Sequence, residues 1–290
     1  MNHGYAPVYP SMVSNRYSEA EQAISKADDV YSKGAMVLHM LRTGLGDELF
    51  TKGTRLYLDR FKFRCAETDD FRRCLEEVSG QNLERFFEQW AERPGLARLQ
   101  VDLEYDAGSS RLSVTIEQSQ RIDRQNPAYE FRLPILVKYA DDSSEYVYVA
   151  VESKRTEAVF RVASKPAQVT VDPNATVLCA STVRKPLAMW IDELRSGPTL
   201  IARVRAAEAL AGIGGASTGG EGDADTVLQR IANDADEDIT VREAAANAVN
   251  IRTAHALAGP GMNGIVRVAR ALGFTSGTRQ IAASRPSGGR

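Results

Sequence analysis

Histidine and cysteine, the side chains that most often bind zinc, are scarce in this sequence of 290 residues. The cysteines are Cys65, Cys74 and Cys179, and the histidines are His3, His39 and His255. An odd number of cysteines without CxxC spacing predicts neither a disulfide framework nor a zinc ligand set. It favours small buried thiols in a reducing compartment, so we expect the cytoplasm.

Long apolar runs and a strong charge of one sign are absent as well. No stretch is long enough to span a bilayer, and the start, MNHGYAPVYPS, lacks the basic and apolar regions of a signal peptide. The formal net charge is −2, which gives no reason to expect a nucleic-acid or membrane partner. The length favours two or three modest domains.

Helical periodicity begins near residue 28 and continues to residue 95. In the first helix of this region, Val30, Ala35, Val37, Leu38 and Leu41 recur at helical spacing. Further helices are expected from Asp47 to Phe63, from Thr68 to Ser79 and through LERFFEQW. Residues 1–27 show no sustained period and are interpreted as a connecting segment.

From Leu99 the period changes to two, as in LQVDLEY, RLSVTIEQ and EYVYVAVES. Alternating apolar and polar residues separated by Asp, Gly, Ser and Asn turns predict an antiparallel β-sandwich over residues 96–180. The fold class expected for the chain is therefore α+β, with several domains.

Alanine-rich helices follow in residues 184–250. The segments ARVRAAEAL and VREAAANAV align at an offset of 39 residues, which predicts short HEAT-like repeats able to bind a protein partner. Residues 251–290 contain six arginines and no acidic residue. This composition predicts a basic, disordered tail.

The blocks VYSKGAMVLHML, LFTKGTRLYLDRF and TDDFRRCLEEVSGQNLERFFEQW, followed by a Pro-Gly exit into strands, resemble the M1 zinc aminopeptidases. The resemblance runs from about Val30 to Cys179. It implies the C-terminal half of that family's thermolysin-like catalytic domain and its following β-sandwich, with the helical repeats resembling an appended C-terminal domain. It also implies hydrolysis of N-terminal residues from peptides.

The resemblance assigns a role to Tyr31. In M1 enzymes the tyrosine of a Y-x-K-G block donates a hydrogen bond to the oxyanion formed during peptide hydrolysis. A phenol stays protonated at neutral pH and can therefore donate without adding charge. Without the family, a tyrosine at a helix start is more often a packed side chain. Lys33 is expected to be partly snorkelled, and Gly34 to allow a close helix contact.

Two other elements of that family are missing. M1 enzymes bind one zinc with the histidines of HExxH and a glutamate, and this sequence has neither HExxH nor the amine-binding G-x-M-E-N segment. No residue is therefore expected to bind a metal or cofactor, and His39 is interpreted as a hydrogen-bonded histidine at a core edge.

Other chemistries find little support. The acid pairs Glu76-Glu77 and Asp141-Asp142 are adjacent and should diverge, as solvated faces or turns. Ser32 and Ser79 lack a G-x-S-x-G context. The Gly-rich stretch GIGGASTGGEGD lacks the Lys-Ser/Thr of a phosphate-binding loop and is interpreted as a linker.

Three hypotheses remain open. The chain is part of an M1 aminopeptidase whose zinc-bearing half is missing, which predicts an inactive polypeptide with an exposed apolar patch. Alternatively it is a non-catalytic M1-like scaffold that binds protein partners through its helical repeats. In the third, a separate polypeptide supplies the zinc half, and only then does the chain meet a peptide substrate.

Overall fold

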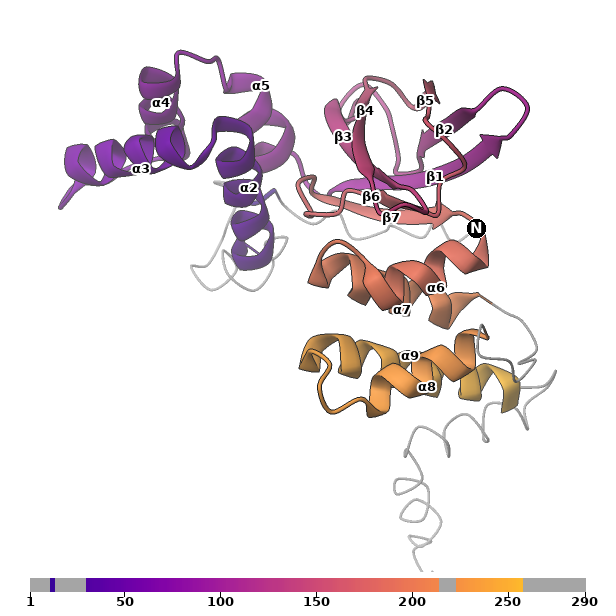
Figure 1. Cartoon of the computed structure of the whole chain (residues 1–290). Coiled ribbons are helices and arrows are strands. Elements are labelled where there is room, and N and C mark those ends of the chain that lie inside the picture. Colours follow the sequence, from indigo (N-terminus) through magenta and orange to yellow (C-terminus); the bar gives the residue numbers. More distant parts are fainter. Residues whose placement is uncertain (1–10, 14–29, 214–222, 258–290) are drawn as a thin grey trace, which may run out of the picture. The chain divides into compact units, whose positions relative to one another are not determined.

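The computed structural model describes residues 11–13, 30–213 and 223–257 (Figure 1). They belong to two compact units. The first unit extends to Pro166 and includes Val171–Arg184, and the second consists of Ala167–Thr170 and the chain from Lys185 onward. Helices and largely antiparallel sheets make this an α+β fold. No described helix is both long and apolar enough to cross a membrane.

The first unit begins with a helical region. Its elements are α2 (Val30–Leu45), α3 (Asp47–Phe61), α4 (Thr68–Ser79), α5 (Glu84–Phe87) and the π-helical turn η1 (Glu88–Glu92). The ends of α4 follow from local chemistry. Glu67 and Asp70 form a capping box at its start, and Gly80, at φ 67°, takes the left-handed conformation that ends it.

Helix α2 has two distinct faces. The buried face consists of Lys33, Val37, Met40 and Leu41. Of the apolar residues expected on the core side, Ala35 is exposed and Leu38 is 44% exposed. The expected stripe is therefore only partly right, because the buried face also includes Lys33 and Met40, which were not among the residues expected there.

The strands of the first unit form two sheets. They are β1 (Ala97–Asp106), β2 (Arg111–Gln118), β3 (Phe131–Lys138), β4 (Ser144–Val151), β5 (Arg155–Arg161) and β7 (Cys179–Arg184), while β6 (Gln168–Val171) ends at the return into this unit. One sheet has the order β5-β2-β1-β7. In the other, β3 pairs antiparallel with β4, from Phe131 opposite Val151 to Lys138 opposite Ser144.

The expectation of a purely antiparallel sandwich is wrong at one edge. Strand β7 pairs parallel with β1, with Val101 opposite Val183. Parallel neighbours need a long connection, and here the whole of β2 to β6 lies between them. Alternation along β1 and β2 still predicts the core, since Leu99, Val101, Val114 and Ile116 are almost completely buried.

The second unit contains α6 (Leu187–Ser196), α7 (Leu200–Gly212), α8 (Ala224–Asn233) and α9 (Ile239–Leu257). Helix α9 continues past residue 250, so a tail beginning at residue 251 is wrong in its boundary. Arg252, counted in that tail, forms an ion pair with Asp225 and donates to the carbonyl oxygens of Leu210 and Ile213.

Three of the expected segments fall largely outside the described residues. They are the connecting segment, of which residues 1–10 and 14–29 are not described, the Gly-rich linker (214–222) and the rest of the tail (258–290).

Candidate functional site

Tyr31, the residue assigned to oxyanion stabilisation by the family resemblance, lies in the first turn of α2 and is 72% exposed. It belongs to the outward face of the helix, with Ala35, Leu38 and Arg42 at the following turns. We call these four residues the Tyr31 face. A large aromatic side chain that is not packed can offer its hydroxyl to another molecule. The packed alternative for Tyr31 does not describe this structure.

Lys33 fixes the same end of α2 from the opposite side. Only 7% of this residue is exposed, and its Nζ donates a 2.7 Å hydrogen bond to the carbonyl oxygen of Arg93, just after η1. A snorkelled lysine was expected, so this prediction is wrong. The buried ammonium needs a partner, and the carbonyl at the end of η1 supplies it.

The other end of α2 is held by the β6–β7 loop. The carboxylate of Asp172 accepts hydrogen bonds from the backbone of Thr176 and Val177 at 2.7 and 3.0 Å. In the loop that it shapes, Leu178 N–H donates to Met40 Sδ at 3.3 Å.

His39, next to Met40 in α2, contacts the same loop. Its Nε2 lies 3.2 Å from the carbonyl oxygen of Asn174. His39 is thus hydrogen-bonded as expected, although it is exposed and not at a core edge.

Gly34 does not provide the close helix contact that was expected of it among the described residues. A methyl group at this position would lie 3.5 Å from Met12 Sδ, which is an ordinary contact distance. No helix needs the missing side chain of Gly34 for close approach among the described residues. The tight glycine of this region is Gly53 in α3, where an added methyl would lie 2.6 Å from Leu75 Cδ2.

Gln89 joins the helical region to the sandwich, and Gln118 of β2 fixes Tyr129, the sandwich residue on which Trp90 of η1 stacks. Gln89 of η1 donates to the Glu130 carbonyl at 2.9 Å and accepts from the Glu130 N–H at 2.7 Å. Gln118 makes the corresponding pair of bonds with Tyr129, at 2.8 and 2.9 Å. Trp90 stacks on Tyr129 with ring centroids 4.9 Å apart. These contacts hold η1 against the sheets. They therefore also fix the position of the Arg93 carbonyl, just after η1, to which Lys33 of α2 donates.

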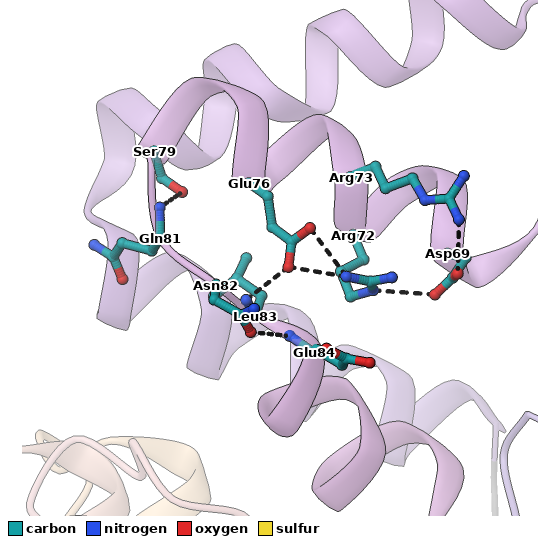
Figure 2. Close-up of polar contacts among 9 residues, drawn as sticks. All are labelled: Asp69, Arg72, Arg73, Glu76, Ser79, Gln81, Asn82, Leu83 and Glu84. Atoms are coloured by element: carbon teal, nitrogen blue, oxygen red, sulfur yellow. Dashed lines mark hydrogen bonds and ion pairs between the residues drawn. The ribbon is translucent and has the colours of Figure 1, made fainter.

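The acid pair Glu76-Glu77 has a structural role. Figure 2 shows Glu76 between Arg72 and the backbone of Leu83, with its carboxylate 3.0 Å from Arg72 Nη1 and 2.8 Å from Leu83 N. Arg72 also reaches Asp69 at 3.0 Å, and this guanidinium lowers the pKa of the Asp69 carboxyl. Glu77 points to Arg60 instead. The pair diverges as expected, but its members are ion-paired and not simply solvated.

The zinc of the resembled family does not fit the residues present. Residues 11–13, 30–213 and 223–257 contain no group of three His, Cys, Asp or Glu side chains placed to hold a metal ion. Within the described residues, the Tyr31 face therefore has residues that hold its helix in place, but no set of metal ligands beside it.

Sequence reasoning missed Gln89 and Asp172, which support this site, and it missed the burial and the partner of Lys33. Lys33, Gln89 and Asp172 are polar and almost completely buried. Only Asp172 had a sequence signal, since Asp-Pro-Asn marks a turn. The partners of Lys33 and Gln89 lie 60 and 41 residues away, beyond the reach of any local pattern.

Comparison with known proteins gives a consistent picture. The pattern of the Peptidase family M1 domain matches residues 7–90. A glutamyl aminopeptidase from Bitis rhinoceros is 30% identical over 132 residues, covering 45% of this chain and 14% of the relative. The aminopeptidase N of Streptomyces lividans is 36% identical over 103 residues, covering 33% and 12%.

The fold is similar to that of a solved structure. The crystal structure of Legionella pneumophila aminopeptidase A in complex with aspartic acid aligns with 97% of this chain and 34% of that chain, at TM-score 0.61 and 14% identity. The curated relatives are much longer than the aligned segment: the alignment covers 14% of the length of the relative from Bitis rhinoceros. Together with the block order around Tyr31, these matches show that residues 7–90 correspond to part of the Peptidase family M1 domain and that the chain is similar to a segment of M1 aminopeptidases.

Proposed function

We propose that this chain supplies the tyrosine-bearing part of an M1 aminopeptidase site. The observation that carries the proposal is the position of Tyr31, exposed in the first turn of a helix whose opposite face is fixed by Lys33. In the proposed reaction, the Tyr31 hydroxyl donates a hydrogen bond to the oxygen of the scissile carbonyl as negative charge develops there. One such donor typically contributes about 3 kcal/mol of transition-state stabilisation.

A donor of this kind works only if its position is fixed before the substrate arrives. The contacts of Lys33 with the Arg93 carbonyl and of Met40 with the Leu178 N–H hold α2 near both of its ends. Substrate groups would approach from the side of the Tyr31 face, since the remaining face of the helix is buried.

The hydrolytic machinery itself would come from outside these residues. The sequence holds three histidines and no HExxH, so we infer that the polypeptide of 290 residues has no peptidase turnover alone. The exposed Tyr31 and Leu38 would then form part of the surface that the metal-bearing portion of the family's catalytic domain covers.

The test is a metal analysis and an aminopeptidase assay of the isolated chain. After dialysis against zinc, we expect less than one zinc per chain and no hydrolysis of a panel of aminoacyl anilides. One bound zinc per chain with chelator-sensitive turnover would contradict the inferred inactivity.

The second candidate function is a non-catalytic M1-like scaffold. It is favoured by the two helical hairpins of the second unit, α6–α7 and α8–α9, which we infer to be HEAT-like repeats because their second helices align at an offset of 39 residues. Such repeats present surfaces to protein partners. A tyrosine-dependent activity in an active M1 background would favour the first function over this one.

A further inference from the structure

Arg203 joins the two helical hairpins of the second unit. It is the fourth residue of α7, and its Nε donates to the carbonyl oxygen of Leu194 at 2.9 Å. Both terminal nitrogens bind the carboxylate of Glu237, in the turn between α8 and α9, and Nη1 lies 2.8 Å from Oε1. One arginine of the first hairpin therefore pairs with an acid in the turn of the next.

Arg242 occupies the equivalent position in the second hairpin. It is the fourth residue of α9 and lies 39 residues after Arg203. The helix starts match too, because Thr199 caps α7 through its bond from Ala202 N, and Asp238 accepts from Thr240 N at the start of α9. Thr199 and Asp238 are separated by the same 39 residues.

The hydrogen bonding of the two arginines differs. Arg242 Nε is buried and has no hydrogen-bond partner within the part of the chain that the structure describes. The corresponding Nε of Arg203 donates to Leu194. The second hairpin thus repeats the arginine of the first without repeating the hydrogen bond of its Nε.

The residues that follow the two arginines differ in burial as well. Ala207 in α7 is completely buried, but the aligned Ala246 in α9 is only half-buried. Val249 is half-buried where α7 has the completely buried Leu210. Side chains that the next hairpin covers on α7 are therefore partly uncovered on α9. We call Arg242, Ala246 and Val249 the Arg242 face.

Residues 244–290 offer no equivalent acid to the Arg242 face. A third hairpin in the same register would place its acid 39 residues after Glu237, where the sequence has Ser276, and residues 244–290 contain no Asp or Glu. A second copy stacked by its first hairpin would present Pro198, which aligns with Glu237.

We propose that the Arg242 face is a docking surface for an acidic helical hairpin of a partner protein. An aspartate or glutamate in the partner's inter-helix turn binds Arg242 as Glu237 binds Arg203, and this bidentate ion pair supplies specificity. The partly uncovered Ala246 and Val249 gain from burial against the partner's helix.

The proposal is tested with a variant of the full chain that carries one additional helical hairpin. Residues 219–257 are repeated directly after Leu257, so that a second copy of the Glu237 carboxylate stands at the next register position. Arg242→Ala and an alanine in place of that added glutamate are made singly and together in the extended chain. Arg242→Ala in the original chain is the matched control.

We expect the extended chain to gain helix content by circular dichroism. We also expect Arg242→Ala to lower its melting temperature by about 4 °C more than it does in the original chain, with no further loss when the added glutamate is also removed. An added hairpin that stays non-helical, or an equal effect of Arg242→Ala in both chains, would overturn the proposal. So would a concentration-dependent dimer of the original chain that Arg242→Ala abolishes, because the occupant would then be a second copy.

Discussion

The Lys33 ammonium donates its 2.7 Å hydrogen bond to the main-chain carbonyl of Arg93, a residue 60 positions further along the chain. The bond crosses from the helix that carries Tyr31 to the end of η1. It is a charge-assisted hydrogen bond at a buried site, the kind that contributes most to stability. The orientation of the Tyr31 face therefore depends on a contact made beneath it.

Lys33→Met should lower the free energy of unfolding of the first unit by about 2 kcal/mol, because the Arg93 carbonyl loses a charged donor. Urea unfolding followed by tryptophan fluorescence measures this in a Trp190→Phe background, where Trp90 is the remaining tryptophan. Lys52→Met, at an exposed position of α3, is the control and should unfold like the parent. Equal midpoints for the two variants would show that the Lys33 bond does not stabilise the unit.

Gln118→Leu should destabilise the first unit by about 3 kcal/mol. The side chain is fully buried, and its amide donates to the carbonyls of Tyr129 and Ser153 and accepts from Tyr129 N–H. Leucine has a similar size but leaves these buried groups without that partner. The same fluorescence measurement applies, and Gln100→Leu at an exposed position of β1 is the comparison. A loss no larger than that of Gln100→Leu would contradict the assigned role.

Gly53→Ala and Gly44→Ala should have opposite effects. A methyl group at Gly53 would lie 2.6 Å from Leu75 Cδ2 and 3.2 Å from Leu75 Cα, so overpacking should cost about 2 kcal/mol. At Gly44, in α2, the methyl would meet nothing within 4 Å, and the better helix propensity of alanine should add about 0.5 kcal/mol. Thermal unfolding measures both effects as changes in melting temperature. Changes of the same sign for the two variants would be inconsistent with the packing of α3 on α4.

The second unit should lose stability in acid through Glu237. The hydrogen bond from Arg203 holds the pKa of the Glu237 carboxyl below its ordinary value. A folded-state pKa below the unfolded one gives stability that is present above the unfolded pKa of about 4.3 and is lost as pH falls through the folded value.

Glu237→Gln should therefore be less stable than the parent at pH 7 and show a shallower loss of stability between about pH 5 and pH 3. Urea titrations at several pH values, followed by Trp190 in a Trp90→Phe background, measure the slopes. Glu208→Gln, at an exposed position of α7, should keep the parental slope. If the free energy of unfolding falls with pH equally steeply in the parent and in Glu237→Gln, Glu237 does not contribute to the loss of stability in acid.

Much of the fold could be predicted because local signals were strong. The Gly80 stop of α4 and the alternation that buries Leu99 and Val101 need only neighbouring residues. The aligned segments ARVRAAEAL and VREAAANAV both lie in helices, α7 and α9, with Arg203 and Arg242 each as the fourth residue of its helix.

The remainder depends on contacts between distant residues. The parallel pairing of β7 with β1 is decided by where the chain returns after β6, which alternation within CASTVR does not encode. The burial of Lys33 requires a carbonyl after η1, and the exposure of Leu38 requires knowing which neighbours α2 has. The same reason left the supporting half of the candidate site unpredicted.

The most direct test of the central claim uses a chimera. Residues 7–90 of this chain replace the corresponding M1 segment of the Streptomyces lividans aminopeptidase N, and kcat/KM for an aminoacyl anilide is compared between Tyr31 and Tyr31→Phe, with Tyr57→Phe in α3 as the control. If Tyr31 is the oxyanion donor, Tyr31→Phe should lower kcat/KM by about 100-fold or more, and Tyr57→Phe should leave it nearly unchanged. An active chimera that loses no more activity with Tyr31→Phe than with Tyr57→Phe would contradict the proposed role of Tyr31.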